Sequence, residues 1–68
     1  MVAILTIEQK DSLIGMKYDG VQYFSPTQDI NGDWIISEEE INQCRHEPCS
    51  WVKDLTLSEF AGAAIPSI

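Results

Sequence analysis

The chain has 68 residues, of which 44% are apolar, and 11 acidic residues against four basic ones give a formal net charge of −7. This charge excludes nucleic-acid phosphates and anionic membrane surfaces as ligands, because both would be repelled, and it leaves cations, basic protein surfaces and neutral partners. A chain this short hides only about 60% of the surface that it exposes when unfolded, so we expect one thin-cored domain over residues 1–68 whose stability is marginal without a partner, a metal or a disulfide.

The chain opens with an apolar run from Val2 to Leu5, and the first predicted element is a helix from Ile7 to about Ile14. Thr6 precedes this helix and Gln9 follows three residues later, which is the capping-box arrangement that satisfies two backbone donors at a helix start. Gly15 is placed to end the helix in a left-handed cap.

Between Tyr18 and Pro26 the sequence favours a turn that leads into an edge strand. Asp19-Gly20 is a turn dipeptide. Pro26 lacks a backbone donor and biases the preceding serine toward extended geometry. We therefore expect no helix immediately before Asp29.

The stretch from Gln28 to Glu40, QDINGDWIISEEE, fits two incompatible structures, and the first of them is a β-hairpin. Asn31 and Gly32 tolerate the positive φ angles that a two-residue type I′ loop requires at both central positions. The predicted register pairs Ile30 with Asp33, Asp29 with Trp34, Gln28 with Ile35, and Thr27 with Ile36.

Alternation along this hairpin places Trp34 and Ile36 on one face of the sheet and Ile30 and Ile35 on the other. Both faces therefore carry apolar side chains. A sheet in so small a protein does not easily cover both sides from its own chain, so one face is a candidate docking surface. The alternative is that the first helix covers one face and the C-terminal tail covers the other.

The second structure for the same stretch is a calcium loop, to which Asp29 to Glu40 bears a partial resemblance of the EF-hand type. The candidate ligands alternate along the loop and end on a bidentate glutamate at the twelfth position. They are Asp29, Asn31, Asp33, the carbonyl of Ile35, Ser37 and Glu40. Two specific features are missing, because no helix enters the loop and the sixth position is Trp34 instead of glycine. The hairpin is therefore the preferred interpretation, and calcium binding is the alternative.

A second short helix is predicted to begin at Ser37. Glu40 follows three residues later, and the three glutamates from Glu38 to Glu40 occupy the first turn, where the helix dipole stabilises negative charge. Ile41 is expected to point inward, and Pro48 keeps the helix short.

Soft metal ligands occur in one stretch. Cys44, His46 and Cys49 provide three of the four ligands that a structural zinc ion prefers, and Glu47 or a second chain would have to supply the fourth. Reduced, half-buried thiols are the simpler interpretation, and a disulfide across the short loop is the remaining one.

The segment from Trp51 to Phe60 is predicted as a third strand, because its apolar residues alternate with one break at Lys53. A competing interpretation is a C-terminal helix, since Thr56 and Glu59 form another capping pair. The tail over 61–68 is small, apolar and uncharged, so we expect it to pack on the sheet or to insert into a partner.

Together these elements predict a small α+β domain, with a hairpin-based antiparallel sheet of about three strands and one or two short helices. Three stretches carry a resemblance to short uncharacterised proteins of bacteria and their phages: YFSPTQD from Tyr23, NGDWIISEEE from Asn31, and WVKDL from Trp51. This resemblance implies a bacterial or phage origin and a small interaction role or a virion-associated one. It implies no activity and no site residues.

The residues argue against an enzyme. No nucleophile is paired with a base, there is no glycine-rich phosphate loop, and the chain has little mass with which to enclose a pocket of a few hundred Å³. We predict a cytoplasmic or virion-associated module, without catalytic activity, that binds another protein or a second copy of itself. The candidate anchors are Tyr23, Phe24, Trp34 and Trp51. Besides calcium binding, an acidic mimic of nucleic acid is a third hypothesis.

Overall fold

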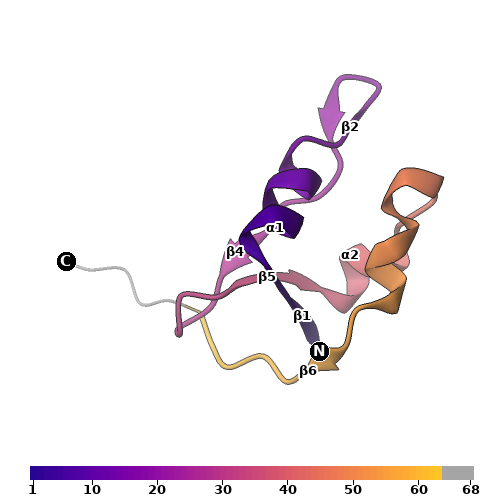
Figure 1. Ribbon diagram of the computed structural model, residues 1–68. Coiled ribbons are helices and arrows are strands. Elements are labelled where there is room, and N and C mark those ends of the chain that lie inside the picture. The colour runs from indigo at the N-terminus through magenta and orange to yellow at the C-terminus, as the bar shows by residue number, and fades with distance from the viewer. Residues whose placement is uncertain (64–68) are drawn as a thin grey trace.

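The computed structural model describes residues 1–63 and shows a small α+β domain (Figure 1). Its elements are, in chain order, β1 (Val2–Leu5), α1 (Ile7–Ile14), β2 (Lys17–Tyr18), β3 (Val21–Gln22), β4 (Thr27–Gln28), β5 (Trp34–Ser37), α2 (Glu38–Asn42), the 3₁₀ helix η1 (Glu47–Asp54) and β6 (Leu57–Ser58). Four strands form one antiparallel sheet in the order β4-β5-β1-β6, and β2 and β3 form a separate hairpin. The predicted fold class is confirmed, and the sheet has one strand more than expected.

The centre of the sheet is β1, which pairs with β5 on one side and with β6 on the other. In the sequence this segment is only a short apolar run. Four apolar residues without alternation are found in strands buried on both sides and also in other buried segments, so the sequence alone does not identify a strand here. The register places Val2 opposite Ser37 and Leu5 opposite Trp34. The strand is therefore defined by partners that lie far along the chain.

α1 begins with the predicted capping box. The N–H of Gln9 donates to Oγ1 of Thr6 at 3.1 Å, and the N–H of Thr6 donates to Oε1 of Gln9 at 2.9 Å. The end of the helix at Gly15 is correct in position but not in conformation, because Gly15 has φ −75° and is right-handed. Leu13 is the residue of α1 that is buried in the core.

A two-residue loop with positive φ at both positions does occur, but at Asp19-Gly20. Asp19 has φ 55° and Gly20 has φ 78°, and they join Tyr18 of β2 to Val21 of β3. This is the backbone geometry of a type I′ hairpin. The geometry that the sequence predicts for Asn31-Gly32 is thus found one hairpin earlier.

The predicted hairpin between β4 and β5 is present, but its loop is one residue longer than predicted. Only Gly32 has a positive φ, of 82°, and its N–H donates to the carbonyl of Asp29 at 3.0 Å. A turn followed by one left-handed residue is the usual three-residue hairpin loop. The predicted left-handed conformation at Asn31 is therefore wrong.

The side chain of Asp29 accounts for the longer loop. Its Oδ1 accepts the N–H of Asn31 at 2.9 Å and the N–H of Asp33 at 3.0 Å, and the residue is only 4% exposed. An aspartate that binds the backbone two residues on forms an Asx turn, which competes with tighter backbone turns. The buried carboxylate of Asp29 therefore determines the length of the loop, which the Asn-Gly dipeptide alone does not determine.

The longer loop shifts the pairing by one residue. Thr27 lies opposite Ile35 and Gln28 lies opposite Trp34, where the sequence analysis expected Ile36 and Ile35. A one-residue shift moves every side chain of β4 to the other face of the sheet. Thr27 consequently shares a face with Ile35.

β5 continues directly into α2 through Ser37, whose Oγ accepts the N–H of Glu40 at 3.2 Å. The predicted start of the second helix is confirmed. Ile41 is the buried residue of this helix, also as expected.

The predicted third strand over Trp51 to Phe60 is wrong for most of its length. Residues 47–54 form η1, with Pro48 in its first turn, and strand structure is confined to β6. A 3₁₀ helix superimposes residues three apart, so Cys49 and Val52 both enter the core with 0% exposure. The alternative C-terminal helix does not form within residues 57–63, and the remaining tail residues, 64–68, lie outside the described part of the chain.

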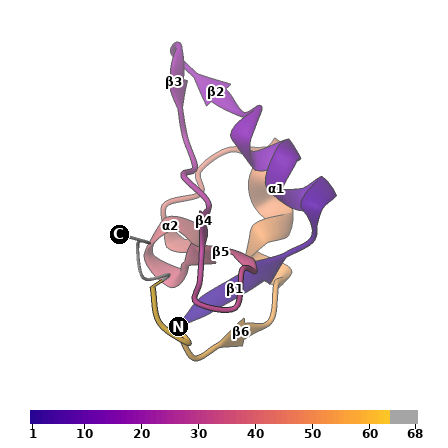
Figure 2. The ribbon, with the colours of Figure 1, turned by 90° about the vertical axis from the view of Figure 1, so that its left-hand side faces the viewer.

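The core lies between one face of the sheet and the layer of helices. Nine buried residues from seven segments of the chain form it, namely Ala3, Leu5, Leu13, Phe24, Ile36, Ile41, Cys44, Cys49 and Val52. α1 lies over this face of the sheet, as Figures 1 and 2 show. The core cluster does not include the residues on the other face of the sheet.

Substituting alanine for Gly32 is expected to lower the free energy of unfolding by about 1–2 kcal/mol, because a Cβ is strained at its φ of 82°. Gly15→Ala is the matched control. Gly15 is right-handed and its Cβ would meet only ordinary contacts at 3.5 Å, so this change should be neutral or stabilising. Urea unfolding of both variants measures the difference, and equal effects would contradict the assigned loop.

Candidate functional site

The sheet has a second apolar face, on the side away from the core. Residues opposite each other on antiparallel strands point to the same side. The register therefore groups Val2, Ile4 and Ile35 on this side, none of which belongs to the core cluster. Val2 and Ile35 are buried, whereas Ile4 is 50% exposed. We call the surface formed by these three residues the open face.

The segment 59–63, which we call the strap, crosses the open face. Figures 1 and 2 show it leaving β6 and reaching the loop between β4 and β5 on the side of the sheet opposite α1. The N–H of Ile30 donates to the carbonyl of Gly62 at 2.8 Å, and Ala63 forms an antiparallel bridge with Asp29. The strap joins the two edges of the sheet and carries Phe60, which is 50% exposed.

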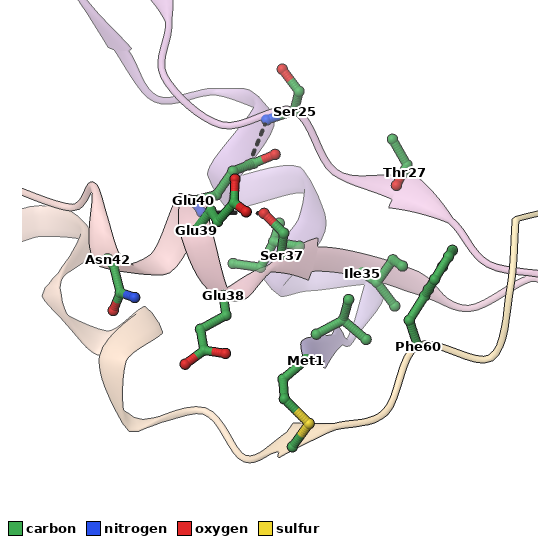
Figure 3. Close-up of a pocket in the computed structure, with 12 residues that line it drawn as sticks. Met1, Ser25, Thr27, Ile35, Ser37, Glu38, Glu39, Glu40, Asn42 and Phe60 are labelled. Carbon is green, nitrogen blue, oxygen red and sulfur yellow. Dashed lines mark hydrogen bonds between the residues drawn. The ribbon is translucent and has the colours of Figure 1, made fainter.

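A groove of about 480 Å³ lies between the strap, β5 and the start of α2. Figure 3 shows Ile35 and Phe60 next to each other at one end, Glu38 and Glu39 toward the other end, and Met1 between them. The volume falls within the range of about 300–1,000 Å³ that is typical of ligand sites. The groove is thus larger than the sequence analysis expected from so short a chain.

One rim of the groove is acidic. Ser37 caps α2, and this places Glu38, Glu39 and Glu40 side by side in its first turn. The carboxylate of Glu40 accepts the N–H of Ser25 at 3.1 Å. Within residues 1–63, no side-chain hydrogen bond or ion pair engages Glu38 or Glu39. These two carboxylates are therefore available to a ligand in the groove.

None of the four predicted aromatic anchors lines the groove. Phe24 is fully buried in the core. Tyr23 packs edge-on against Phe24 at 5.1 Å, and its hydroxyl donates to the carbonyl of Gln43. Trp34 and Trp51 are half-buried and pack against the core. Phe24 thus offers no accessible surface to a partner, and the other three offer part of a ring each.

Three of the six candidate calcium ligands are engaged in local structure, whereas Asn31 and Asp33 are exposed. Asp29 binds the backbone of its own loop, Ser37 caps α2, and Glu40 accepts the N–H of Ser25. Trp34 lies in β5 and does not have a positive φ. In the part of the chain that is described, no three histidine, cysteine or acidic side chains are arranged to hold a metal ion. Calcium binding stays a prediction for which this geometry provides no support.

The cysteines form a buried pair. Sγ of Cys44 and Sγ of Cys49 both donate to the carbonyl of His46, at 3.5 and 3.1 Å. The ring of His46 stacks on Tyr18 with centroids 3.7 Å apart. Burial, with a smaller contribution from the Cys49 thiol, raises the pKa of the Cys44 thiol. The raised pKa favours the neutral form of the Cys44 thiol, which is a poor metal ligand and a poor nucleophile.

No protein-family model, curated protein or solved structure matches this chain. Of the helices that lie within residues 1–63, none is both long and apolar enough to cross a membrane.

Sequence reasoning missed three residues that line the groove on its apolar side, namely Met1, Val2 and Phe60. Val2 lies in a strand that the sequence did not reveal, and Phe60 was assigned to a strand instead of the strap. One signal was available: the segment over 61–68 carries no charge and several apolar residues, which is unusual for a segment exposed to water. The sequence analysis expected this segment to pack on the sheet or to insert into a partner. Of its residues, 61–63 complete the strap and contact the loop between β4 and β5.

Proposed function

We propose that this chain is a small acidic protein-interaction module without catalytic activity, and that it binds its partner in the groove on the open face. The observation that carries the proposal is an apolar surface outside the core that the strap covers only in part. Met1, Ile4 and Phe60 are each at least 50% exposed around it. Exposed apolar patches beside a polar rim are typical of protein contact sites.

The chemistry of the groove supports binding in preference to catalysis. No histidine, cysteine or lysine lines it, so its hydroxyl groups have no basic partner there. The hydroxyl of Ser37 is already the acceptor that caps α2. Phe60 supplies the aromatic side chain on which such contacts commonly depend. The groove offers shape, apolar area and charge.

A substitution at Phe60 tests the proposal. Phe60→Ser should leave the fold intact and weaken binding of the partner by roughly 30-fold, which corresponds to about 2 kcal/mol for the loss of an aromatic anchor. The immobilised chain is used to capture its partner from a bacterial extract, and the captured protein is identified and titrated. Val21→Ser is the matched control, because Val21 is 67% exposed but lies on the β2–β3 hairpin away from the groove.

Equal titration curves for Phe60→Ser and the unchanged chain would contradict binding at the open face. If binding instead depends on Tyr23, Trp34 or Trp51, the contact surface is the core side of the sheet, against which these three predicted anchors pack. If Phe60→Ser and Val21→Ser reduce capture equally, the partner is held by nonspecific hydrophobic adsorption and not by a defined site.

The bacterial or phage origin and the cytoplasmic or virion location stay predictions of the resemblance. The nucleic-acid mimic also stays a prediction. The acidic side chains come from α1, α2, η1 and several loops. A mimic requires most of them on one surface.

A further inference from the structure

We infer that the partner presents a basic, amphipathic peptide segment, in which a bulky apolar side chain enters the groove and a neighbouring lysine or arginine meets Glu38 and Glu39. This inference rests on the proposed function and names the class of partner. It combines two independent features of one surface, the apolar side of the groove and its acidic rim.

Among the described residues that line the groove, no basic side chain balances the charge of the rim. The side chains that line the groove include three glutamates and no basic residue. The only ion pair within residues 1–63 joins Lys10 to Asp11, in α1. Because the Debye length is about 8 Å at physiological ionic strength, carboxylates this close to the groove act on any charge placed in it. A cationic side chain at the rim would therefore be attracted.

Local structure explains one of the three glutamates. Glu40 is held by the N–H of Ser25, which ties α2 to the segment before β4. Glu38 and Glu39 make no such contact within residues 1–63 and gain only the helix-dipole interaction of about 0.3–1 kcal/mol each. Three carboxylates within one helical turn repel one another, so a cation near Glu38 or Glu39 relieves part of that repulsion. The arrangement fits a lysine or arginine of the partner better than a neutral group.

The charge also argues against a second copy of this chain as the occupant. Each copy carries a net charge of −7, so an approach of two copies brings like charges together. In a symmetric dimer the same patch would meet itself, and acidic rim would face acidic rim. A separate basic segment meets no such repulsion.

The test uses a display library of random 12-residue peptides, selected on the immobilised full-length chain. Enriched peptides should carry at least two lysine or arginine residues next to an aromatic or long aliphatic residue. Affinities of the enriched peptides are then measured by fluorescence polarisation at low and at high salt. Higher salt should weaken binding, since the rim attraction is partly screened.

The matched variants are Glu39→Lys and Glu8→Lys. Both residues occupy the second position of a capped helix, behind Ser37 and Thr6 respectively, so both changes alter the helix dipole and the net charge equally. Only Glu39 lines the groove. Glu39→Lys should weaken peptide binding more than tenfold, and Glu8→Lys by less than threefold.

Several results would overturn the inference. In the selection, these results are enrichment of neutral or acidic peptides, or no enrichment at all. In the affinity measurements, the result is an equal loss of peptide affinity in the two lysine variants. In sedimentation, it is a dimer that Phe60→Ser dissociates. Neutral apolar peptides that bind and are lost with Phe60→Ser would refute the basic partner and leave the proposed function standing. If Phe60→Ser changes neither the affinity for the peptides nor the affinity for the captured protein, the proposed function itself is refuted.

Discussion

Replacing Phe24 by alanine is expected to unfold a large part of the population at 25 °C. Phe24 is the largest fully buried side chain of the core, with 0% exposure. Phenylalanine-to-alanine changes in cores cost about 3–5 kcal/mol, since they lose burial and leave a cavity. At about 0.05–0.15 kcal/mol per residue, a domain of this size has a total stability of the same order.

Urea unfolding followed by tryptophan fluorescence and far-ultraviolet circular dichroism measures the loss. Phe60→Ala is the matched control, because the same side chain is removed from a position that is 50% exposed. There the expected loss in the free energy of unfolding is about 1 kcal/mol. A Phe24→Ala variant as stable as the control would show that this ring does not occupy the core. Any loss of partner binding on Phe24→Ala is expected to follow from unfolding, whereas Phe60→Ser should lose binding while folded.

Replacing Asp29 by alanine is expected to lower the free energy of unfolding by about 2 kcal/mol, within the range of 1–3 for a removed buried partner. The change deprives the N–H groups of Asn31 and Asp33 of their common acceptor. Asp29→Asn keeps a side-chain oxygen in the same place and should cost less. Thermal unfolding of the two variants beside the unchanged chain measures both effects.

The same three proteins test the calcium alternative. If Asp29 serves only its own loop, millimolar calcium changes no melting temperature and leaves tryptophan fluorescence unaltered. A ligand that binds the folded state stabilises it in proportion to the logarithm of its concentration over Kd. A rise in melting temperature with calcium but not with magnesium, abolished by Asp29→Asn, would establish the calcium loop and displace the hairpin as the functional unit.

Local sequence predicts both helix starts. Thr6 with Gln9, and Ser37 with Glu40, form their capping bonds between residues three apart. Such contacts need nothing from the rest of the chain, so the sequence is sufficient to predict them. The presence of a hairpin around Gly32 follows in the same way from turn chemistry.

The errors lie where local preference and long-range contacts compete. Asn31-Gly32 favours a type I′ loop, but the carboxylate of Asp29 binds the backbone and lengthens it. The alternation after Trp51 suggests a strand, but burial of Cys49 and Val52 against the core selects a 3₁₀ helix. In each case a buried contact outweighs a local preference.

The amino-acid sequence by itself determined the α+β class, the two capped helix starts and the acidic first turn at Glu38 to Glu40. Only the tertiary structure decided that Val2–Leu5 is the central strand, that the strap joins the edges of the sheet, and that a groove lies between them. The physical reason is that a cap depends on neighbours in the chain, whereas strand order and the covering of a sheet face depend on which distant segments bury each other's apolar surface.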